Sequence, residues 1–252
     1  MTSTNPFRLL VVIPVFNHAH AITDLVQTLQ AQSQSCLLVD DGSEPGCAAV
    51  LAALAEQAPT HVALLRLPCN QGKGAAVMAG LREAGRRGYS HALQIDADGQ
   101  HDCNDVPGFV AAARENPQAV IVGAPIFDSS VPKGRLYGRY ATHIWVWINT
   151  LSFDIRDSMC GFRVYPLDAC LALLDQTRLG QRMDFDSEVL VRLHWQGQAI
   201  INRPTRVIYP PNGVSHFDVW RDNVRISRMH ARLFFGMLMR LPRLLLRRLS
   251  AR

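Results

Sequence analysis

Short apolar runs alternate with stretches of helical periodicity through the first half of the chain. The runs contain β-branched residues and end at polar or turn-forming positions, which is typical of buried strands. They predict strands at Leu9–Pro14, Cys36–Val39, Val62–Leu67, His91–Ile95 and Ala119–Gly123. Apolar residues at helical spacing predict helices at Ala21–Gln32, Ala48–Gln57, Gly74–Arg87 and Val106–Arg114. Strands that alternate with helices imply an α/β fold with a mostly parallel central sheet flanked by helices.

The second half of the chain has a less regular pattern, particularly between residues 137 and 163. It predicts helices at Tyr140–Leu151 and Phe185–Trp195, and a late strand over Ala199–Ile208 that Pro204 interrupts. A last helix is expected to begin near Val219 and to run until Pro242, because an interior proline kinks or ends a helix.

Polar residues follow three of the predicted strands at their carboxyl ends. Asn17 follows the first strand, Asp40 and Asp41 follow the second, and Asp96 and Asp98 follow the fourth. Ligands of open α/β sheets bind at the carboxyl ends of the strands. We therefore expect these side chains to share one active site.

Asp96 and Asp98 are separated by a single residue on a turn, so both carboxylates can hold one divalent cation. Oxygen ligands suit magnesium or manganese, which then bridge substrate phosphates. Gln100 follows closely and offers a further ligand. The same spacing also occurs in solvated surface turns, but its place after an apolar strand favours the metal site.

Two further motifs each allow two interpretations. Asp40 and Asp41 would bind the base and ribose of a nucleotide, or they would form a turn and cap a helix. Lys73 lies in a glycine-containing turn, Asn70–Gly74, that opens a helix and resembles a phosphate cradle. It is not a Walker A loop, and the alternative is a glycine turn with a solvated lysine.

Five motifs occur in the order found in family 2 glycosyltransferases of the GT-A fold, and the chain resembles that family. The likeness is greatest to its polyprenyl-phosphate sugar transferases, the group of dolichol-phosphate mannosyltransferase. The matching segments are Val12–Asn17, Val39–Ser43, Asn70–Ala75, Asp96–His101 and Asp157–Arg163. Each motif is moderately specific, whereas the ordered set is highly specific and extends over about residues 9–216.

The resemblance implies that the protein moves a sugar, with inversion, from a UDP- or GDP-sugar to a lipid or polyprenyl-phosphate acceptor. It assigns donor binding to Pro14, Asn17, Asp40, Asp41, Lys73, Asp96 and Arg163. It assigns a magnesium or manganese ion to Asp96, Asp98, Gln100 and His216, and the alternative for His216 is a plain surface histidine.

The resemblance also identifies Asp157 as the candidate catalytic base that deprotonates an acceptor hydroxyl. Asp186, accompanied by Glu188, is the competing candidate. A structural alternative remains for each: Asp157 would pair with Arg163 in a turn, and Asp186 would cap a helix. If the acceptor is an ionised phosphate, no base is needed and Asp157 would orient other groups.

The chain departs from the polyprenyl-phosphate branch at two places where that branch carries phosphate-binding cations. Ala124 and Pro125 stand where the branch often has Ser-Arg, and Gly213–His216 lacks the lysine of its late motif. Arg135 and Arg139 remain as acceptor-phosphate contacts.

The net charge of +5 is concentrated at the C-terminus, where no acidic residue follows Asp222. Leucine, phenylalanine and methionine recur there at helical spacing with arginine between them, which suits an anionic membrane surface. The alternative is a helix packed on the core, and the lack of exposed stacking aromatics argues against nucleic acid. We therefore expect a GT-A domain over residues 1–218 and a basic amphipathic helical tail over residues 219–252.

The chain of 252 residues has no apparent secretory signal and no apolar stretch of about 20 residues. The expected location is cytoplasmic, peripheral at the inner face of the membrane.

Two other functions remain open: a sugar-phosphate nucleotidyltransferase, and a non-catalytic nucleotide-binding scaffold. The first would need a Gly-rich basic loop after the first strand, and Pro14–Asn17 does not supply one.

Overall fold

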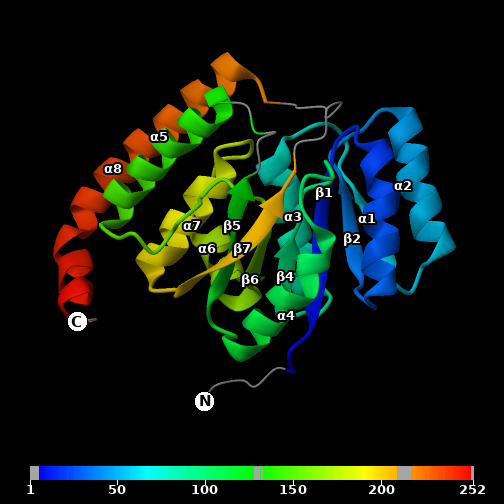
Figure 1. Ribbon diagram of the computed structural model, residues 1–252, viewed down its shortest axis with the longest axis horizontal. Helices are drawn as coiled ribbons and strands as arrows, with labels where there is room; N and C mark the ends of the chain where they lie inside the picture. Colours follow the sequence, from blue (N-terminus) through cyan, green and yellow to red (C-terminus); the bar gives the residue numbers. More distant parts are fainter. Residues whose placement is uncertain (1–5, 128–130, 132, 209–216, 251–252) are drawn as a thin grey trace.

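The computed structural model describes residues 6–127, 131, 133–208 and 217–250, with the side chains of Lys133, Arg135, Arg248, Leu249 and Ser250 outside that description. Seven strands form one sheet in the order β3-β2-β1-β4-β6-β5-β7 (Figure 1). Their bounds are β1 Leu9–Val15, β2 Cys36–Asp40, β3 Val62–Arg66, β4 His91–Gln94, β5 Val120–Phe127, β6 Arg163–Pro166 and β7 Ile200–Val207. β6 runs antiparallel to both of its neighbours, whereas the other pairs are parallel.

Helices cover both faces of the sheet, as the alternating pattern predicts. They are α1 Ala19–Ala31, α2 Pro45–Gln57, α3 Lys73–Arg86, α4 Val106–Glu115, α5 Lys133–Thr150, α6 Leu167–Gln176, α7 Phe185–Gln196 and α8 Val219–Ser250, with a short 3-10 turn, η1 Cys103–Asp105, before α4. The α/β class with a mostly parallel sheet is confirmed.

Successive residues of a strand point to opposite faces, so the sheet divides the interior into two apolar layers. In β1, Val11 and Ile13 pack with α1, α2 and α4, whereas Leu10 and Val12 pack on the side of α3, α6 and α7. In β1 and β2 the strand interior is apolar and buried, so their polar side chains lie at the carboxyl ends.

α8 lies alongside α5, and both helices belong to the second layer (Figure 1). Ile226, Met229, Leu233, Met237 and Leu244 of α8 are buried within that layer. One face of the basic C-terminal helix therefore packs on the core, while other apolar residues of the same helix stay exposed.

Both prolines that were expected to interrupt elements lie inside them. α8 continues through Pro242 to Ser250. Beyond the proline, Leu244 is buried and Arg247 Nη1 donates to the carbonyl of His194, and these contacts hold the last turns. Pro204 pairs with Ala124 within β7, which is an edge strand where a missing N–H is tolerated.

Candidate active site

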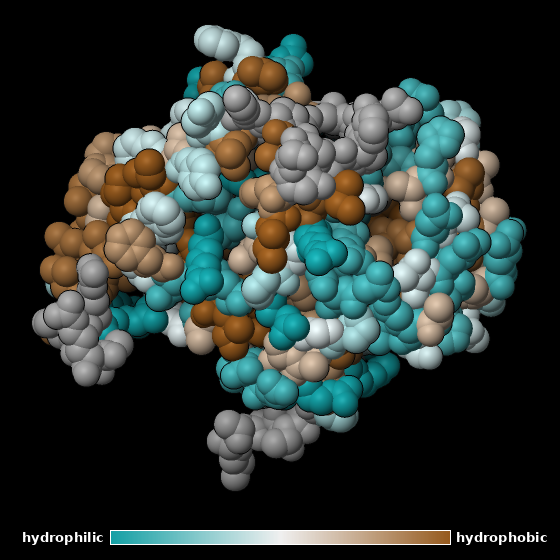
Figure 2. Space-filling view, in the orientation of Figure 1, coloured by the Kyte–Doolittle hydropathy of each residue, from teal (hydrophilic) through white to brown (hydrophobic). Residues whose placement is uncertain are grey.

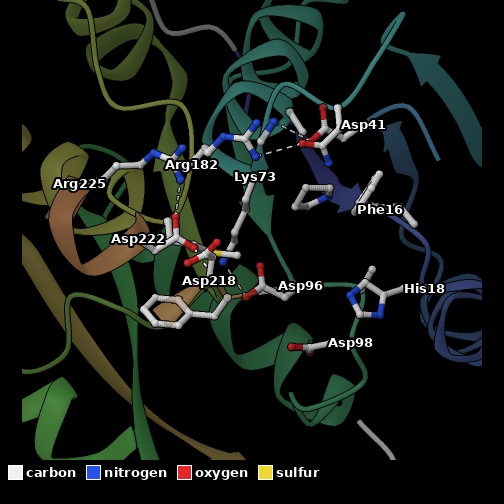
Figure 3. A pocket seen from close by; sticks show the side chains of 18 of the residues that line it. Phe16, His18, Asp41, Lys73, Asp96, Asp98, Arg182, Asp218, Asp222 and Arg225 are labelled. Carbon is white, nitrogen blue, oxygen red and sulfur yellow. Dashed lines mark hydrogen bonds and ion pairs between the residues drawn. The ribbon is translucent and has the colours of Figure 1, made fainter. Parts of the chain in front are cut away.

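A cleft of about 490 Å³ opens at the carboxyl ends of β1, β2 and β4, between the start of α3 and the start of α8 (Figure 3). Pro14 and Phe16 line it after β1, Asp41 after β2, and Asp96 and Asp98 after β4. Three of the five polar residues that the sequence places at these ends, Asp41, Asp96 and Asp98, therefore do share one site.

Asp41 faces the cleft, whereas Asp40 does not. The Asp41 carboxylate accepts hydrogen bonds from the backbone N–H groups of Gln71 (2.7 Å) and Gly72 (2.8 Å). Burial raises the pKa of Asp41, against these two hydrogen bonds, which lower it. Asp40 is fully buried, accepts from the Ser43 N–H and lies 3.2 Å from Arg66 Nε.

Asn17 supports the wall of the cleft and is not among its lining residues. It has a positive φ of 57°, a conformation that asparagine tolerates better than most residues. Its side-chain oxygen accepts from the Glu44 N–H at 2.9 Å, and its own N–H donates to Ser43 Oγ at 3.1 Å. Asn17 thus joins the loop after β1 to the start of α2.

Lys73, the first residue of α3, extends its ammonium into the cleft toward Asp96 (Figure 3), and it also contacts Asp186. Nζ lies 2.8 Å from Asp96 Oδ2 and 2.8 Å from Asp186 Oδ2. Burial disfavours the charged ammonium, but Asp186 and Asp96 outweigh it and raise the pKa of Lys73 well above its usual range. The lysine is therefore a permanent cation within the site.

Asp186, at the start of α7, is held from behind by buried groups. Gln94 Nε2 donates to its Oδ1 at 3.1 Å, and Arg163 Nη1 donates to its backbone carbonyl at 2.6 Å. Arg163 has no exposed surface and also bonds the carbonyls of Cys160 and Ser158. Its guanidinium therefore does not reach the cleft where the donor is expected.

The Asp96 and Asp98 carboxylates retain oxygens that could bind a cation in addition to the Lys73 ammonium. Asp96 Oδ1 is buried and accepts no hydrogen bond from any described residue. Burial and then the charge of Asp96 raise the pKa of Asp98. Gly161 packs so closely on Asp96 that any side chain there would collide with the carboxylate.

These two carboxylates fit a magnesium or manganese ion that completes its shell with substrate phosphates and water. Gln100 lines the same cleft, and its N–H donates to Asp98 Oδ1. Within the described ranges no group of three His, Cys, Asp or Glu side chains is arranged to hold a metal. His216, the fourth expected ligand, lies outside the described residues.

Asp157 lies outside the group that lines the cleft, in the segment before β6. Its Oδ2 is 2.6 Å from Arg139 Nε and 3.2 Å from His143 Nε2, and its Oδ1 accepts from the N–H groups of Met159 and Cys160. Burial opposes ionisation, but His143 and Arg139 outweigh it and hold the pKa of Asp157 well below its usual range. The alternative pairing with Arg163 is not formed, and the Arg135 side chain lies outside the description.

Several charged residues of the cleft were missed from the sequence because they follow no predicted strand. Arg182 donates from Nη1 to Asn70 Oδ1 at 3.1 Å, next to the glycine turn. Asp218 lies just before α8, and Arg221, Asp222 and Arg225 lie in its first turns. A spacing of three and four residues places them on one side. That spacing does not indicate that this side faces the cleft.

The described part of the cleft carries more negative than positive groups. Its carboxylates are Asp41, Asp96, Asp98, Asp218 and Asp222, and its lysine and arginine residues are Lys73, Arg182, Arg221 and Arg225. Five carboxylates and four lysine or arginine side chains give the described part of the cleft a net negative charge, which would repel an anionic nucleotide. A bound divalent cation would make this net charge positive.

Residues 10–173 match the sequence model of the family described as glycosyl transferase family 2. The chain is 28% identical over 204 residues to the dolichyl-phosphate beta-glucosyltransferase of Dictyostelium discoideum, covering 72% of this chain and 61% of that one. It is 33% identical over 165 residues to dolichyl-phosphate beta-glucosyltransferase ALG5D of Trichomonas vaginalis, covering 62% and 48%. The chain thus spans about half to three fifths of the length of these two relatives.

Solved structures share the fold at low sequence identity. Glucosyl-3-phosphoglycerate synthase of Mycobacterium tuberculosis superposes with a TM-score of 0.65 at 13% identity, covering 92% of this chain and 80% of that one. The same synthase with Mn²⁺ and UDP-glucose gives 0.62 at 14% identity, covering 93% and 79%. Mannosyltransferase PcManGT of Pyrobaculum calidifontis, with GDP-Man and Mn²⁺, gives 0.58 at 15% identity, covering 94% and 65%. The GT-A fold expected from the motif order is confirmed.

Proposed function

Because the chain belongs to glycosyl transferase family 2, we propose that it transfers a sugar from a UDP- or GDP-sugar to a lipid-linked acceptor, with magnesium or manganese. The observation that carries this proposal is the convergence of Asp41, Lys73, Asp96 and Asp98 on one cleft. The names of the two dolichyl-phosphate relatives support the acceptor class, and the Mn²⁺ complexes of the structural neighbours support the metal.

The donor would lie along the strand ends with its diphosphate toward α3. Asp41, with Pro14 and Phe16 nearby, would contact the nucleoside end of the donor. Asp40 would act only by stabilising the turn after β2 through its hydrogen bond with the Ser43 N–H. Asp96 and Asp98, with Gln100 and His216 as further candidates, would hold the metal. When bound, the metal would offset charge on the departing nucleoside diphosphate.

Lys73 and Arg182, which both line the cleft, would bind the diphosphate. Asp186 would position Lys73, because its carboxylate is already engaged by that ammonium and by Gln94. Arg163 is buried and donates to the backbone carbonyl of Asp186, so it would hold Asp186 in position. Direct contact with the donor would fall to Lys73 and Arg182.

The environment of Asp157 favours a phosphate acceptor over a hydroxyl acceptor. A carboxylate with a depressed pKa is a weak proton acceptor, whereas a lipid phosphate is already ionised and needs no base. Asp157 would then orient Arg139 toward the acceptor phosphate through their ion pair. Arg135, one turn earlier on α5, would be a second contact.

The acceptor would be reached at a membrane surface. No helix among the described residues is long and apolar enough to cross a bilayer. Apolar side chains nevertheless gather over α5 and α8 (Figure 2), and the exposed ones include Tyr140, Ile144, Trp145, Phe235, Leu238, Met239, Leu245 and Leu246. Arginines of α8 beside them would bind anionic headgroups, and we place this contact at the inner face of the cytoplasmic membrane.

A donor-turnover assay separates this function from its rivals. The purified protein is incubated with a panel of nucleotide sugars and Mn²⁺, and released nucleoside diphosphate is measured; we expect release from one or two donors. Pyrophosphate release from a nucleoside triphosphate and a sugar 1-phosphate would instead identify a nucleotidyltransferase. Nucleotide binding without turnover of any donor, with polyprenyl phosphate present, would identify a non-catalytic scaffold.

A further inference from the structure

Lys73 occupies one oxygen of Asp96, and no described residue donates a hydrogen bond to the other. The ammonium lies 2.8 Å from Asp96 Oδ2, and His101 Nε2 approaches the same oxygen at 3.9 Å. Asp96 Oδ1 is buried without a hydrogen bond from any described group. The carboxylate expected to bind a divalent cation is therefore already paired with a monovalent one.

The second partner of Lys73 is fixed in place, so any movement falls to the lysine. Asp186 is tied to Gln94 and Arg163 in the core. The backbone before Lys73 is also fixed, because Asp41 binds the N–H groups of Gln71 and Gly72. The flexible four-carbon stem of Lys73 can reorient its ammonium without any shift of this backbone.

From this geometry we propose that Lys73 couples metal binding to donor binding. In the free protein its ammonium neutralises Asp96. It also repels a divalent cation, because like charges a few ångströms apart repel each other strongly in a partly buried site. A diphosphate bound at the start of α3 draws the ammonium away and leaves Asp96 to the metal. The inference rests on the proposed function and adds an order: the metal binds tightly only together with the nucleotide.

Manganese binding without any nucleotide tests this proposal directly. Free Mn²⁺ is titrated by electron paramagnetic resonance against the wild type and against Lys73→Met, with folding checked by circular dichroism. We expect the variant to bind Mn²⁺ about tenfold more tightly, because Asp96 loses its competing cation. Lys73→Gln, which keeps a hydrogen-bond donor but no charge, should show the same direction and serves if Lys73→Met fails to fold.

Arg182→Met is the matched control. It removes one positive charge from the same cleft, but Arg182 bonds Asn70 and not Asp96. We expect its affinity for Mn²⁺ to stay within about threefold of the wild type. If Arg182→Met and Lys73→Met raised the Mn²⁺ affinity equally, the effect would come from net charge and the proposal would be wrong. The proposal would also be wrong if neither lysine variant bound Mn²⁺ more tightly than the wild type.

A second titration with UDP or GDP present distinguishes failure of the coupling from failure of the function. The wild type should bind Mn²⁺ more tightly with the nucleotide, and Lys73→Met should bind the nucleotide itself more weakly. If Mn²⁺ and nucleotide bind together in the wild type but the lysine variants leave free-protein affinity unchanged, only the coupling is wrong. If the wild type binds neither ligand, the proposed function itself is wrong.

Discussion

Arg139 of α5 and Asp157 of the segment before β6 form a short ion pair, with Nε 2.6 Å from Oδ2. His143, one turn further along α5, lies 3.2 Å from the same oxygen. The carboxylate thus binds two side chains of one helix, and its other oxygen is satisfied by two backbone N–H groups. This contact ties the helix that carries the expected acceptor-binding arginines to the segment before β6.

Asp157→Asn should therefore affect acceptor binding more than chemistry. With a polyprenyl-phosphate acceptor we expect the KM for acceptor to rise and the donor KM to stay nearly constant, because Arg139 loses its orienting partner. Arg139→Gln should reproduce this pattern. A general base would behave differently: kcat would fall by roughly 10²–10⁴-fold at saturating acceptor while its KM stayed the same.

Asp98 should make the metal-free protein less stable as the pH rises. Its pKa in the folded protein is raised by burial and by Asp96, so folding favours the protonated form. That stability is fully present below the unfolded pKa of about 4 and is lost as the pH rises through the folded pKa. We expect the melting temperature of Asp98→Asn to exceed that of the wild type by an amount that grows above about pH 4.

The same melting experiment gains a second arm with Mn²⁺ and a nucleoside diphosphate at neutral pH. These ligands should raise the melting temperature of the wild type and have little effect on Asp98→Asn, because the variant lacks one metal-binding oxygen. Equal stabilisation of both proteins would contradict the assignment of Asp98 to the metal.

The two faces of α8 should respond differently to truncation. Leu233 is fully buried against the core, whereas Phe235 is 65% exposed on the same helix. Leu233→Ala should lower the free energy of unfolding by about 2–5 kcal/mol, and Phe235→Ala should change it little. Urea denaturation measures the free energy of unfolding of both variants. Similar decreases in the two would contradict the packing of α8 on the core through its Leu233 face.

Binding to anionic liposomes should depend on the exposed face alone. Replacing Phe235 and Met239, which is 78% exposed, with serine should weaken flotation with anionic vesicles and leave the melting temperature unchanged. Added salt should reduce binding of the wild type without abolishing it, because apolar burial persists when charges are screened. A wild-type protein that ignores anionic vesicles at low salt would remove the proposed membrane contact.

The sequence predicts the strands that are long or apolar and misses the one that depends on its neighbours. β6 has only four residues and pairs antiparallel between β4 and β5, so its position follows from tertiary packing and not from local periodicity. The helix α6, Leu167–Gln176, which follows β6, was not predicted either. Pro242 and Pro204 disturb their elements less than expected. Contacts of Leu244 and Arg247 hold the last turns of α8, and Pro204 lies on an edge strand where a missing N–H is tolerated.

The active-site residues likewise fall into two groups: those that local sequence predicts and those that depend on tertiary packing. Strand ends are readable from sequence, so Asp41, Asp96 and Asp98 could be placed together in advance. Which of two adjacent aspartates faces the cleft depends on backbone geometry, and Asp40 points into the protein. The contribution of α8 through Arg221 and Arg225 depends on how the chain returns to the sheet, which no local pattern contains.

Sugar transfer to a lipid phosphate tests the central claim most directly. The purified protein is incubated with Mn²⁺, labelled nucleotide sugars and a polyprenyl phosphate, and label that enters the organic phase is measured. We predict a labelled glycosyl phospholipid with one donor, its loss when Mn²⁺ is chelated, and its loss in Asp98→Asn. Donor turnover that releases only free sugar, with no label in the lipid under any of these conditions, would contradict the account.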